Sequence, residues 1–398
     1  MKIRKLKPEE NVHKLLLHST CFLDFEPEDR YEWLKDPMAH SEGYENAWGG
    51  FLEDGTLCSC VEYTPLDMQF NNRPVSTGIV SGVATLPEAR NKGFVREMLK
   101  SIFTEMKDNG QIFSFVYPFS YSYYRKFGYE QSYTRYQAEI PISSMVGYPY
   151  PDGVKSYRKG GDFSDFAAVY NAFIRDKNMA ILRDSDAWQE ILDRDPHLKR
   201  EYTYLHYSEQ GEADAYILYK PEELNGDGGT LLVQELAWST PCGLHAMLGF
   251  IHGLRTEYEN MKWEYPNCVD VFSLFAESWE ISIGWTSAGM SRIVDLPKVL
   301  ELLDAPTANG QVVIDVSDAF LPWNTGKYLI AWEDGKLSVS HTDMPADMET
   351  NIEVLTQLVT GYISPTQALA KKGIRIHSKM DNLTALFPKK YMYMMEHY

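Results

Sequence analysis

The chain of 398 residues carries 56 acidic and 38 basic side chains, a formal charge of −18, with 44% apolar and 24% charged residues. This composition is that of a folded protein long enough for two or three domains, and its negative charge argues against DNA or RNA as the main partner. The acidity favours either the attraction of cationic small molecules or simple solubility, and composition leaves both open.

The first residues predict a strand, a helix and a hairpin. Residues 1–6 alternate like a short strand, and acidic residues after Pro8 indicate the first turn of a helix. Two strands over 48–63 surround the turn Glu53-Asp54-Gly55, which is a hairpin signal.

A second hairpin turn at residues 71–74 leads into a strand predicted over 76–85. Apolar residues recur at helical spacing over 94–107, and Asp108-Asn109-Gly110 is expected to end that helix before a strand over 112–116. Together these elements predict an α/β layer around one central loop.

The composition changes twice further along the chain. Prolines and glycines over 145–162 predict a linker or an elaborate loop, and helices and strands follow it. Near Met290 a strand passes into a helix, and alternating segments come after it. The sequence therefore predicts three units, 1–148, 149–288 and 289–398.

The central loop, Arg90-Asn91-Lys92-Gly93, gathers two cations and a glycine between a strand and a helix. The first amides of a helix have no internal partner, and the helix dipole adds positive charge there. Gly93 permits close approach of the backbone, and Arg90 and Lys92 add full charges. This pattern predicts a site for a phosphate-bearing ligand, although neither a Walker loop nor GxGxxG is present.

The sequence Arg90-x-x-Gly93 resembles the acetyl-CoA pyrophosphate loop of the GCN5-related N-acetyltransferases (GNAT). That loop usually has the form Arg/Gln-x-x-Gly-x-Gly/Ala, and Val95 departs from it at the last position. A bulkier residue there is expected to narrow the room beside the phosphates. An ordinary basic turn between a strand and a helix is the alternative.

Three further segments resemble the enhanced intracellular survival (Eis) family of acetyltransferases. These are SYYRKFGYE (122–130), MSRIVDLPKVL (290–300) and the final ALFPKKYMYMMEHY. The resemblance implies an α/β (α+β) chain of two tandem GNAT-type domains, the second degenerate, followed by a domain similar to sterol carrier proteins. It also implies acetyl-CoA as cosubstrate and assembly into hexamers.

The resemblance also assigns residues to the cofactor. The strand before the loop is expected to hold pantetheine through its backbone, the start of the helix to hold the pyrophosphate, and the next strand to open beside them. The residues concerned are Val83, Ala84, Thr85, Arg90, Asn91, Lys92, Gly93, Phe94, Val95, Arg96, Phe119 and Ser120.

Tyr124 matches the catalytic tyrosine of the family. A phenol with a pKa near 10 can protonate a departing thiolate whose acid has a pKa of about 8.5. The alternative is a packing role, because the chain holds 26 tyrosines and five of them fall between 117 and 129.

The last eight residues, YMYMMEHY, are unusually apolar for a terminus, so we expect them to dock into a groove. Docking would desolvate the carboxylate of Tyr398, raise its pKa and make it a better base. In the family this group takes the proton from the substrate amine. The alternative is that the tail only fastens domains together.

Asp24, Glu26 and Trp33 are candidates for an acidic and aromatic pocket that binds a polycation, although such a charged run is often a solvated face. The histidines show no HExxH spacing, and the five scattered cysteines lack CxxC, so no metal and no disulfide framework are predicted. GxSxG is absent, which leaves serine hydrolysis without support. No signal-peptide stretch or membrane span is visible, which predicts a cytoplasmic protein.

The sequence therefore predicts an N-acetyltransferase that transfers acetyl directly to a primary amine of a cationic small molecule, aminoglycoside- or polyamine-like. Two alternatives remain. One is a carrier of an apolar ligand whose acetyltransferase regions are scaffold, and Val95 supports it. The other is an acetyltransferase acting on a protein N-terminus or lysine.

Overall fold

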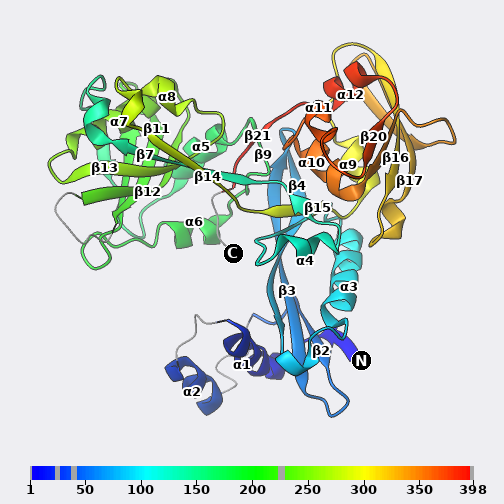
Figure 1. The fold of residues 1–398 in the computed structure, drawn as a ribbon. Coiled ribbons are helices and arrows are strands. Elements are labelled where there is room, and N and C mark those ends of the chain that lie inside the picture. The colour runs from blue at the N-terminus through cyan, green and yellow to red at the C-terminus, as the bar shows by residue number, and fades with distance from the viewer. Residues whose placement is uncertain (1, 23–26, 37–42, 223–228, 395–398) are drawn as a thin grey trace.

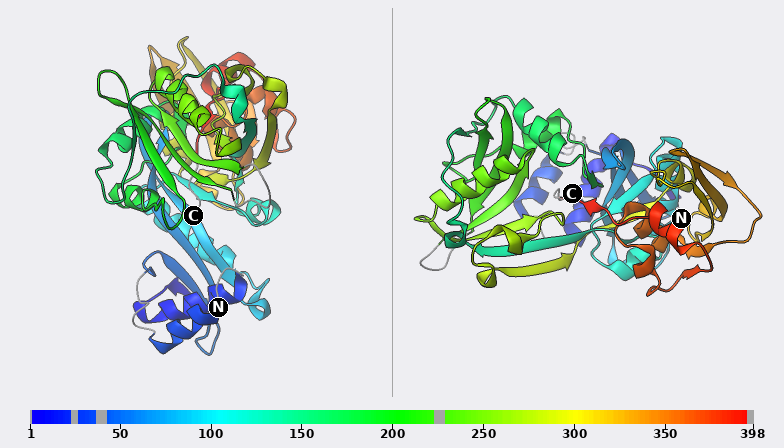
Figure 2. Two further views of the ribbon diagram at one scale, coloured as in Figure 1. Left: turned by 90° about the vertical axis from the view of Figure 1, so that its left-hand side faces the viewer. Right: turned by 90° about the horizontal axis from the view of Figure 1, so that it is seen from above.

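The computed structural model describes residues 2–22, 27–36, 43–222 and 229–394. They form three sheet-based regions, with the second and third side by side and the first extending away from both (Figure 1). A long hairpin of the first region runs between the other two, and Figure 2 shows the same arrangement from two further directions.

The first region is a seven-stranded sheet in the order β1-β2-β3-β4-β5-β15-β6. Its strands are β1 Lys2–Lys5, β2 Ala47–Phe51, β3 Leu57–Phe70, β4 Arg73–Thr85, β5 Phe113–Val116, β15 Met290–Ile293 and β6 Glu130–Gln131. Its helices are α1 Asn11–Cys21, α2 Pro27–Lys35, α3 Phe94–Asp108 and α4 Tyr121–Arg125. The strands and the two helices predicted up to residue 116 are confirmed, most of them within a few residues at their ends. The exception is β3, which continues to Phe70, beyond the predicted end at Tyr63, and α2 was not predicted.

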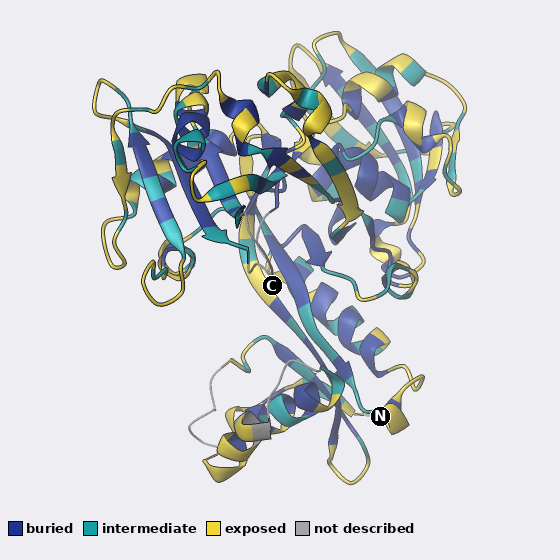
Figure 3. Ribbon diagram, turned by 60° about the vertical axis from the view of Figure 1, so that its left-hand side comes forward, coloured by how far each residue is buried: buried dark blue, intermediate teal, exposed yellow. Residues whose placement is uncertain are grey.

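The β3–β4 hairpin turns at Asn71 and Asn72, which both have positive φ, 51° and 59°. Asparagine accepts this conformation more readily than most residues, and such turns match the twist of a hairpin. The two strands are the longest among the described residues and stay paired from Ser59↔Thr85 to Phe70↔Arg73. Buried residues continue along much of their length (Figure 3).

Helix α3 covers one face of the first sheet. The predicted apolar stripe is confirmed as its buried face, which comprises Phe94, Val95, Met98, Leu99, Ile102, Phe103 and Met106. These side chains join the strand residues Val61, Tyr63, Val80 and Val116 in one apolar core, so the helix is fixed behind the strands that it follows.

The second region is another seven-stranded sheet, in the order β14-β7-β13-β12-β11-β10-β8. Its strands are β14 Ser282–Ser287, β7 Thr134–Pro141, β13 Tyr258–Tyr265, β12 Gly229–Trp238, β11 Ala213–Pro221, β10 Tyr202–Tyr207 and β8 Val154–Ser156. Its helices are α5 Ser164–Phe173, α6 Ser185–Ile191, α7 Pro241–Gly253 and α8 Val271–Leu274.

The third region has a five-stranded sheet in the order β18-β17-β16-β19-β20. Its strands are β18 Lys336–His341, β17 Gly326–Glu333, β16 Gly310–Ser317, β19 Met348–Asn351 and β20 Ile374–Ile376. Its helices are α9 Leu296–Glu301, α10 Ile352–Thr360, α11 Pro365–Ala368 and α12 Met380–Leu386.

Two connections tie the regions together. Strand β15, which follows the second sheet in sequence, lies between β5 and β6 of the first sheet. Near the end of the chain, β21 Tyr391–Met392 pairs in parallel with β9 Lys177–Asn178. Met392, Tyr393 and Met394 are buried, so the expected docking of the tail is confirmed as far as Met394.

Candidate active site

Strands β4 and β5 run in parallel and then diverge. They pair from Thr77↔Phe113 to Val80↔Val116, whereas β4 continues to Thr85 with only β3 beside it. Within the described chain, the β5-facing edge of β4 beyond Val80 therefore has backbone groups without a neighbouring strand. Such an edge can accept an extended ligand through main-chain hydrogen bonds.

The loop after β4 exposes the beginning of α3. Asn91 and Gly93 have positive φ, 62° and 87°, and Gly93 occupies the N-cap position, where it provides no side chain to cap the helix. The first hydrogen bond back to the cap runs from the Glu97 amide to the Gly93 carbonyl, 3.2 Å. The amides of residues 94–96 consequently have no acceptor within the helix, and such a helix start can bind an anion.

A cavity of about 710 Å³ lies where the strands diverge, between the start of α3 and the residues around α4. It is lined by Cys21, Phe22, Val83, Ala84, Thr85, Ala89, Arg90, Asn91, Gly93, Phe94, Val95, Arg96, Phe119, Tyr123, Lys126 and Phe127. Three of these are cations and none is acidic. In a chain with 56 acids and 38 bases, this cavity is locally positive.

The predicted cofactor residues all line this cavity except Lys92 and Ser120. Lys92 is exposed, and Ser120 is the N-cap of α4, where its hydroxyl accepts a hydrogen bond from the Tyr123 amide at 3.4 Å. Arg90 donates from Nε to the Thr85 carbonyl, 3.3 Å away, so its guanidinium is held against the end of β4.

Val95 is buried and belongs to the apolar core behind the cavity, although it also contributes to the cavity wall.

Tyr124 lies behind the cavity wall. Its ring packs against those of Phe119, Tyr123 and Tyr129 at centroid distances of 5.5, 5.3 and 5.8 Å, and the residue is 2% exposed. Burial raises the pKa of Tyr124 well above its usual value, and the neighbouring phenols Tyr129 and Tyr123 add to that shift. The side chain that reaches the wall is the adjacent Tyr123.

Family models match each of the three regions. Acetyltransferase (GNAT) domain models match residues 2–132 and 179–293, and a sterol carrier protein domain model matches residues 296–395. The N-acetyltransferase Eis of Mycobacterium tuberculosis is 24% identical over 321 residues, 75% of this chain and 74% of that protein. The chain is an Eis-like GNAT acetyltransferase. GNAT acetyltransferases use acetyl-CoA as donor.

Other relatives agree with this assignment. An uncharacterized N-acetyltransferase of Streptomyces coelicolor is 22% identical over 340 residues, 79% of each chain. A GCN5-related N-acetyltransferase from Anabaena variabilis has a TM-score of 0.85 at 20% identity, over 100% of both chains. Eis1 from Mycobacterium abscessus has a TM-score of 0.82 at 16% identity, also over 100% of both. These two structures establish the shared fold.

The structure describes only one of the residues predicted to bind the acceptor amine or to act as general base. Asp24, Glu26 and Tyr398 lie outside the described residues. Trp33 is in α2, is 9% exposed and is not part of the cavity lining. The segment that carries Asp24 and Glu26 begins directly after Phe22, which does line the cavity.

Sequence reasoning missed several lining residues, namely Cys21, Phe22, Ala89, Tyr123, Lys126 and Phe127. Lys126 was detectable, because it is a cation within the same segment as Tyr124. It lies with its ammonium 5.7 Å from the centre of the Tyr123 ring. Cys21 and Phe22 come from the end of α1, and no motif linked that helix to the central loop.

Two features are absent from the described residues. No cluster of three or more His, Cys, Asp or Glu side chains is arranged to hold a metal ion in those residues. None of the described helices combines the length and the apolar character needed to cross a bilayer.

Proposed function

We propose that the chain transfers an acetyl group from acetyl-CoA to a primary amine of a cationic small molecule, aminoglycoside- or polyamine-like. Donor and acceptor would bind together and react directly. The observation that carries the proposal is the 710 Å³ cavity at the diverging strands, with cationic side chains and free helix amides in its wall.

In this proposal, the pantetheine, the diphosphate and the thioester of acetyl-CoA contact different groups of residues. The free edge of β4 at Val83, Ala84 and Thr85 would hydrogen-bond the amides of pantetheine. The amides of residues 91–96, with the charges of Arg90 and Lys92, would bind the diphosphate. Phe119 and Ser120 would lie beside the thioester, since Phe119 is in the wall and Ser120 begins α4.

Tyr124 is proposed as the general acid. Because burial raises its pKa, the phenol stays protonated at neutral pH and holds a proton for the departing CoA thiolate. Among the described residues, none forms a hydrogen bond with the Tyr124 hydroxyl, so its proton is not committed to another group in that part of the chain. The raised pKa also weakens the acid, so alignment with the sulfur must contribute most of its effect.

The carboxylate of Tyr398 is proposed as the general base. The tail that leads to it is anchored by β21, and the Tyr133 hydroxyl contacts the backbone of Met394. A single glycine added after Tyr398 moves this carboxylate by one residue. We expect kcat to fall by about 10²-fold, the lower range for general acid–base catalysis, while the dissociation constant for CoA stays unchanged. If the chain with the added glycine folds and its turnover is unchanged, the Tyr398 carboxylate is not the general base.

Asp24, Glu26 and Trp33 are proposed as contacts of the cationic acceptor. The support is that Asp24 and Glu26 follow closely in sequence after Phe22, which lines the cavity. Replacing Asp24 and Glu26 by their amides should raise KM for a cationic amine without changing KM for acetyl-CoA. Equal KM values in the variant and the parent would exclude these residues.

The experiment that tests the function pairs a calorimetric titration of CoA with a turnover screen of small amines and peptides. An apolar-ligand carrier would give no saturable heat with CoA, and turnover of peptides alone would favour a protein acetyltransferase. A cytoplasmic homohexamer is proposed from the family resemblance, and sedimentation of the purified chain tests the hexamer.

A further inference from the structure

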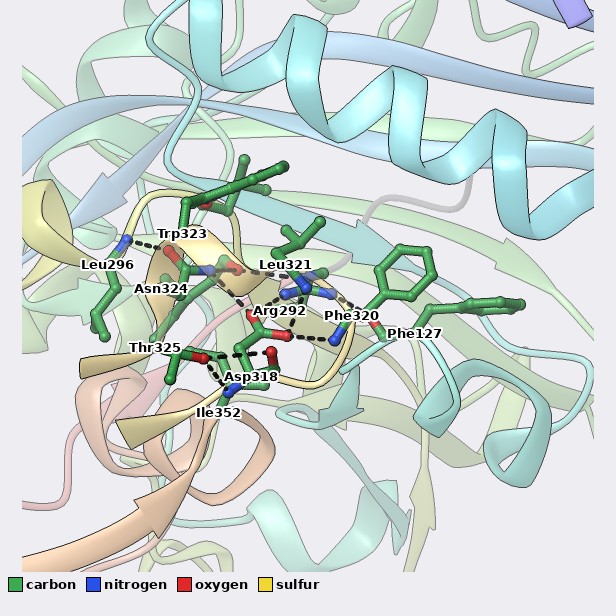
Figure 4. Close-up of polar contacts among 12 residues, drawn as sticks. Phe127, Arg292, Leu296, Asp318, Phe320, Leu321, Trp323, Asn324, Thr325 and Ile352 are labelled. Atoms are coloured by element: carbon green, nitrogen blue, oxygen red, sulfur yellow. Dashed lines mark hydrogen bonds and ion pairs between the residues drawn. The ribbon is translucent and has the colours of Figure 1, made fainter. Parts of the chain in front are cut away.

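Arg292 is a fully buried cation at the junction of the first and third regions. It lies on β15 and is 0% exposed. Its Nη1 donates to the Phe127 carbonyl, its Nε to the Ile293 carbonyl at 3.1 Å, and its Nη2 to the Asp318 carboxylate at 2.5 Å (Figure 4). One guanidinium therefore joins the turn after α4 to a loop of the third region.

The turn after α4 is shaped to receive this guanidinium. Gly128 has φ of +81°, and a Cβ atom at that position would lie 2.7 Å from Nη1 of Arg292. Any other residue would be strained and would displace the cation. This accounts for the glycine in SYYRKFGYE, the segment that also carries Tyr124.

The Asp318 carboxylate organises the loop on the third-region side. Its Oδ1 accepts hydrogen bonds from the backbone amides of Phe320 and Leu321 at 3.0 and 2.9 Å (Figure 4). Its Oδ2 accepts one from the side-chain Nδ2 of Asn324 at 3.0 Å. Together with Arg292, these donors satisfy both carboxylate oxygens. The position of Phe320 is thus set by the same ion pair.

Phe320 stands directly behind the cavity wall. Its ring packs on the Phe127 ring at 5.3 Å, and the Arg96 guanidinium lies over its face at 5.0 Å. Phe127 and Arg96 both line the cavity. A side chain of the third region consequently supports an aromatic and a cationic part of that wall.

We propose that Arg292, Asp318 and Phe320 are positioning residues of the acetyl-CoA site, and that the third region is a structural part of that site. Arg292 fixes the end of α4 and with it the Tyr124 ring, and Phe320 fixes Phe127 and Arg96. The inference rests on the proposed binding of acetyl-CoA in this cavity.

The energetics agree with a positioning role. A buried ion pair contributes little net stability compared with a packed apolar pair, although removing one partner alone is costly. What the pair provides is a defined geometry, because the planar guanidinium bonds a carbonyl and a carboxylate in fixed directions.

The test compares three variants by calorimetric titration with CoA, which needs no acceptor. Phe320→Leu keeps the ion pair and removes the ring under Arg96. Asp318→Asn removes the charge that balances Arg292. Asp347→Asn is the matched control, since Asp347 is also a buried third-region carboxylate, bonded to the Val313 amide and Lys379 and not to the first region.

We expect Phe320→Leu and Asp318→Asn to weaken CoA binding about tenfold and to raise KM for acetyl-CoA more than KM for the acceptor. Asp347→Asn should lower Tm but leave both constants within about twofold, inside the usual scatter of neutral changes. If Asp318→Asn does not fold, Phe320→Leu alone decides.

The outcomes separate the inference from the proposed function. If the parent chain binds CoA and the Phe320→Leu variant binds it equally well, the inference is overturned and the proposed function stands. If the parent chain shows no saturable CoA binding, the proposed function fails and the inference fails with it.

Discussion

The first and second regions contain the same strand-to-helix arrangement but differ at the helix start. In each, a pair of parallel strands separates and a helix follows the first strand of the pair. Strands β4 and β5 part after Val80, and β12 and β13 part after Val233. The chain before α3 has a loop with two cations, whereas only Ser239 and Thr240 separate β12 from α7.

The two helix starts satisfy their amides in different ways. Gly93 leaves the first amides of α3 uncapped. At α7 the Thr240 hydroxyl accepts a hydrogen bond from the Gly243 amide at 3.0 Å, and Pro241 has no amide hydrogen to offer. The Asp214 carboxylate also accepts from the Thr240 hydroxyl at 2.9 Å, so the second site already holds a negative charge.

Aromatic side chains also pack beside the point where β12 and β13 separate, next to a cavity of about 620 Å³ that residues 232–235 of β12 and Glu264 help to line. The rings of Trp238 and Trp263 lie 6.3 Å apart across the two strands, and Trp263 is fully buried. From the tail, Tyr393 packs on Phe173 at 5.1 Å and donates from its hydroxyl to Glu235 at 3.2 Å. The lining of that cavity holds acidic side chains, which the lining of the first cavity lacks. Shared topology is therefore not sufficient for an anion site, which also needs free helix amides and a lining without carboxylates.

We call the separation of β4 and β5 the first cleft and that of β12 and β13 the second cleft. The largest effect is expected from placing in the first cleft an indole like those that pack beside the second. Val83→Trp places an indole in the cavity at the free edge of β4. It should weaken CoA binding by at least about 10²-fold, because the indole takes up space in the cavity and blocks the main-chain hydrogen bonds proposed between β4 and pantetheine. Calorimetry with CoA measures it. Thr286→Trp, at an exposed position of β14, is the control for adding an indole. Retained affinity in Val83→Trp would show that the cofactor binds elsewhere.

The next effect concerns the two adjacent tyrosines. Tyr124→Phe should lower kcat by about 10²-fold, a typical loss for a general acid, and should leave CoA affinity unchanged. Tyr123→Phe is the matched control, since Tyr123 lines the cavity and its ring packs on Tyr124. Steady-state kinetics with the best amine measures both. Loss of kcat in Tyr123→Phe with full activity in Tyr124→Phe would reverse the assignment.

The smallest effect is a pH dependence in the second cleft. Glu264, on β13 just beyond its last pair with β12, pairs with Arg135 at 2.5 Å. Desolvation raises the pKa of Glu264 to about 7, against the opposing effect of Arg135. The folded state then binds more protons than the unfolded state between about pH 4.5 and 7, so stability is lost as the pH rises through this range.

Glu264→Gln removes this titration while keeping the shape of the side chain. The stability of the parent relative to the variant should fall by roughly 2–3 kcal/mol between pH 4.5 and pH 8, because each pKa unit corresponds to about 1.4 kcal/mol. Thermal unfolding of both chains at the two pH values measures it. A constant difference between them would show that Glu264 titrates normally.

Local features of the first cleft could be predicted from the sequence. The cationic loop and the apolar spacing of α3 depend on short-range chemistry, so Arg90, Gly93 and the buried face of the helix follow from neighbouring residues. The choice of Tyr124 came from family resemblance. Periodicity could not distinguish it from Tyr123, which is the one that reaches the cavity wall.

Long-range features could not be predicted. The sequence indicated a strand near Met290, but not that β15 pairs with β5, more than about 170 residues earlier in the chain. Nor did it indicate that Arg292 would contact the turn after Tyr124, or that Phe22 would line the cavity. These depend on tertiary packing between segments that share no local pattern.

The central claim is that only the first cleft binds the cofactor, and the stoichiometry of CoA in a calorimetric titration of the whole chain tests it most directly. The capped helix and the acidic lining of the second cleft predict one CoA per chain, with its affinity lowered at least about 10²-fold by Val83→Trp. Binding of two CoA molecules per chain, or of one CoA with unchanged affinity in Val83→Trp, would contradict it.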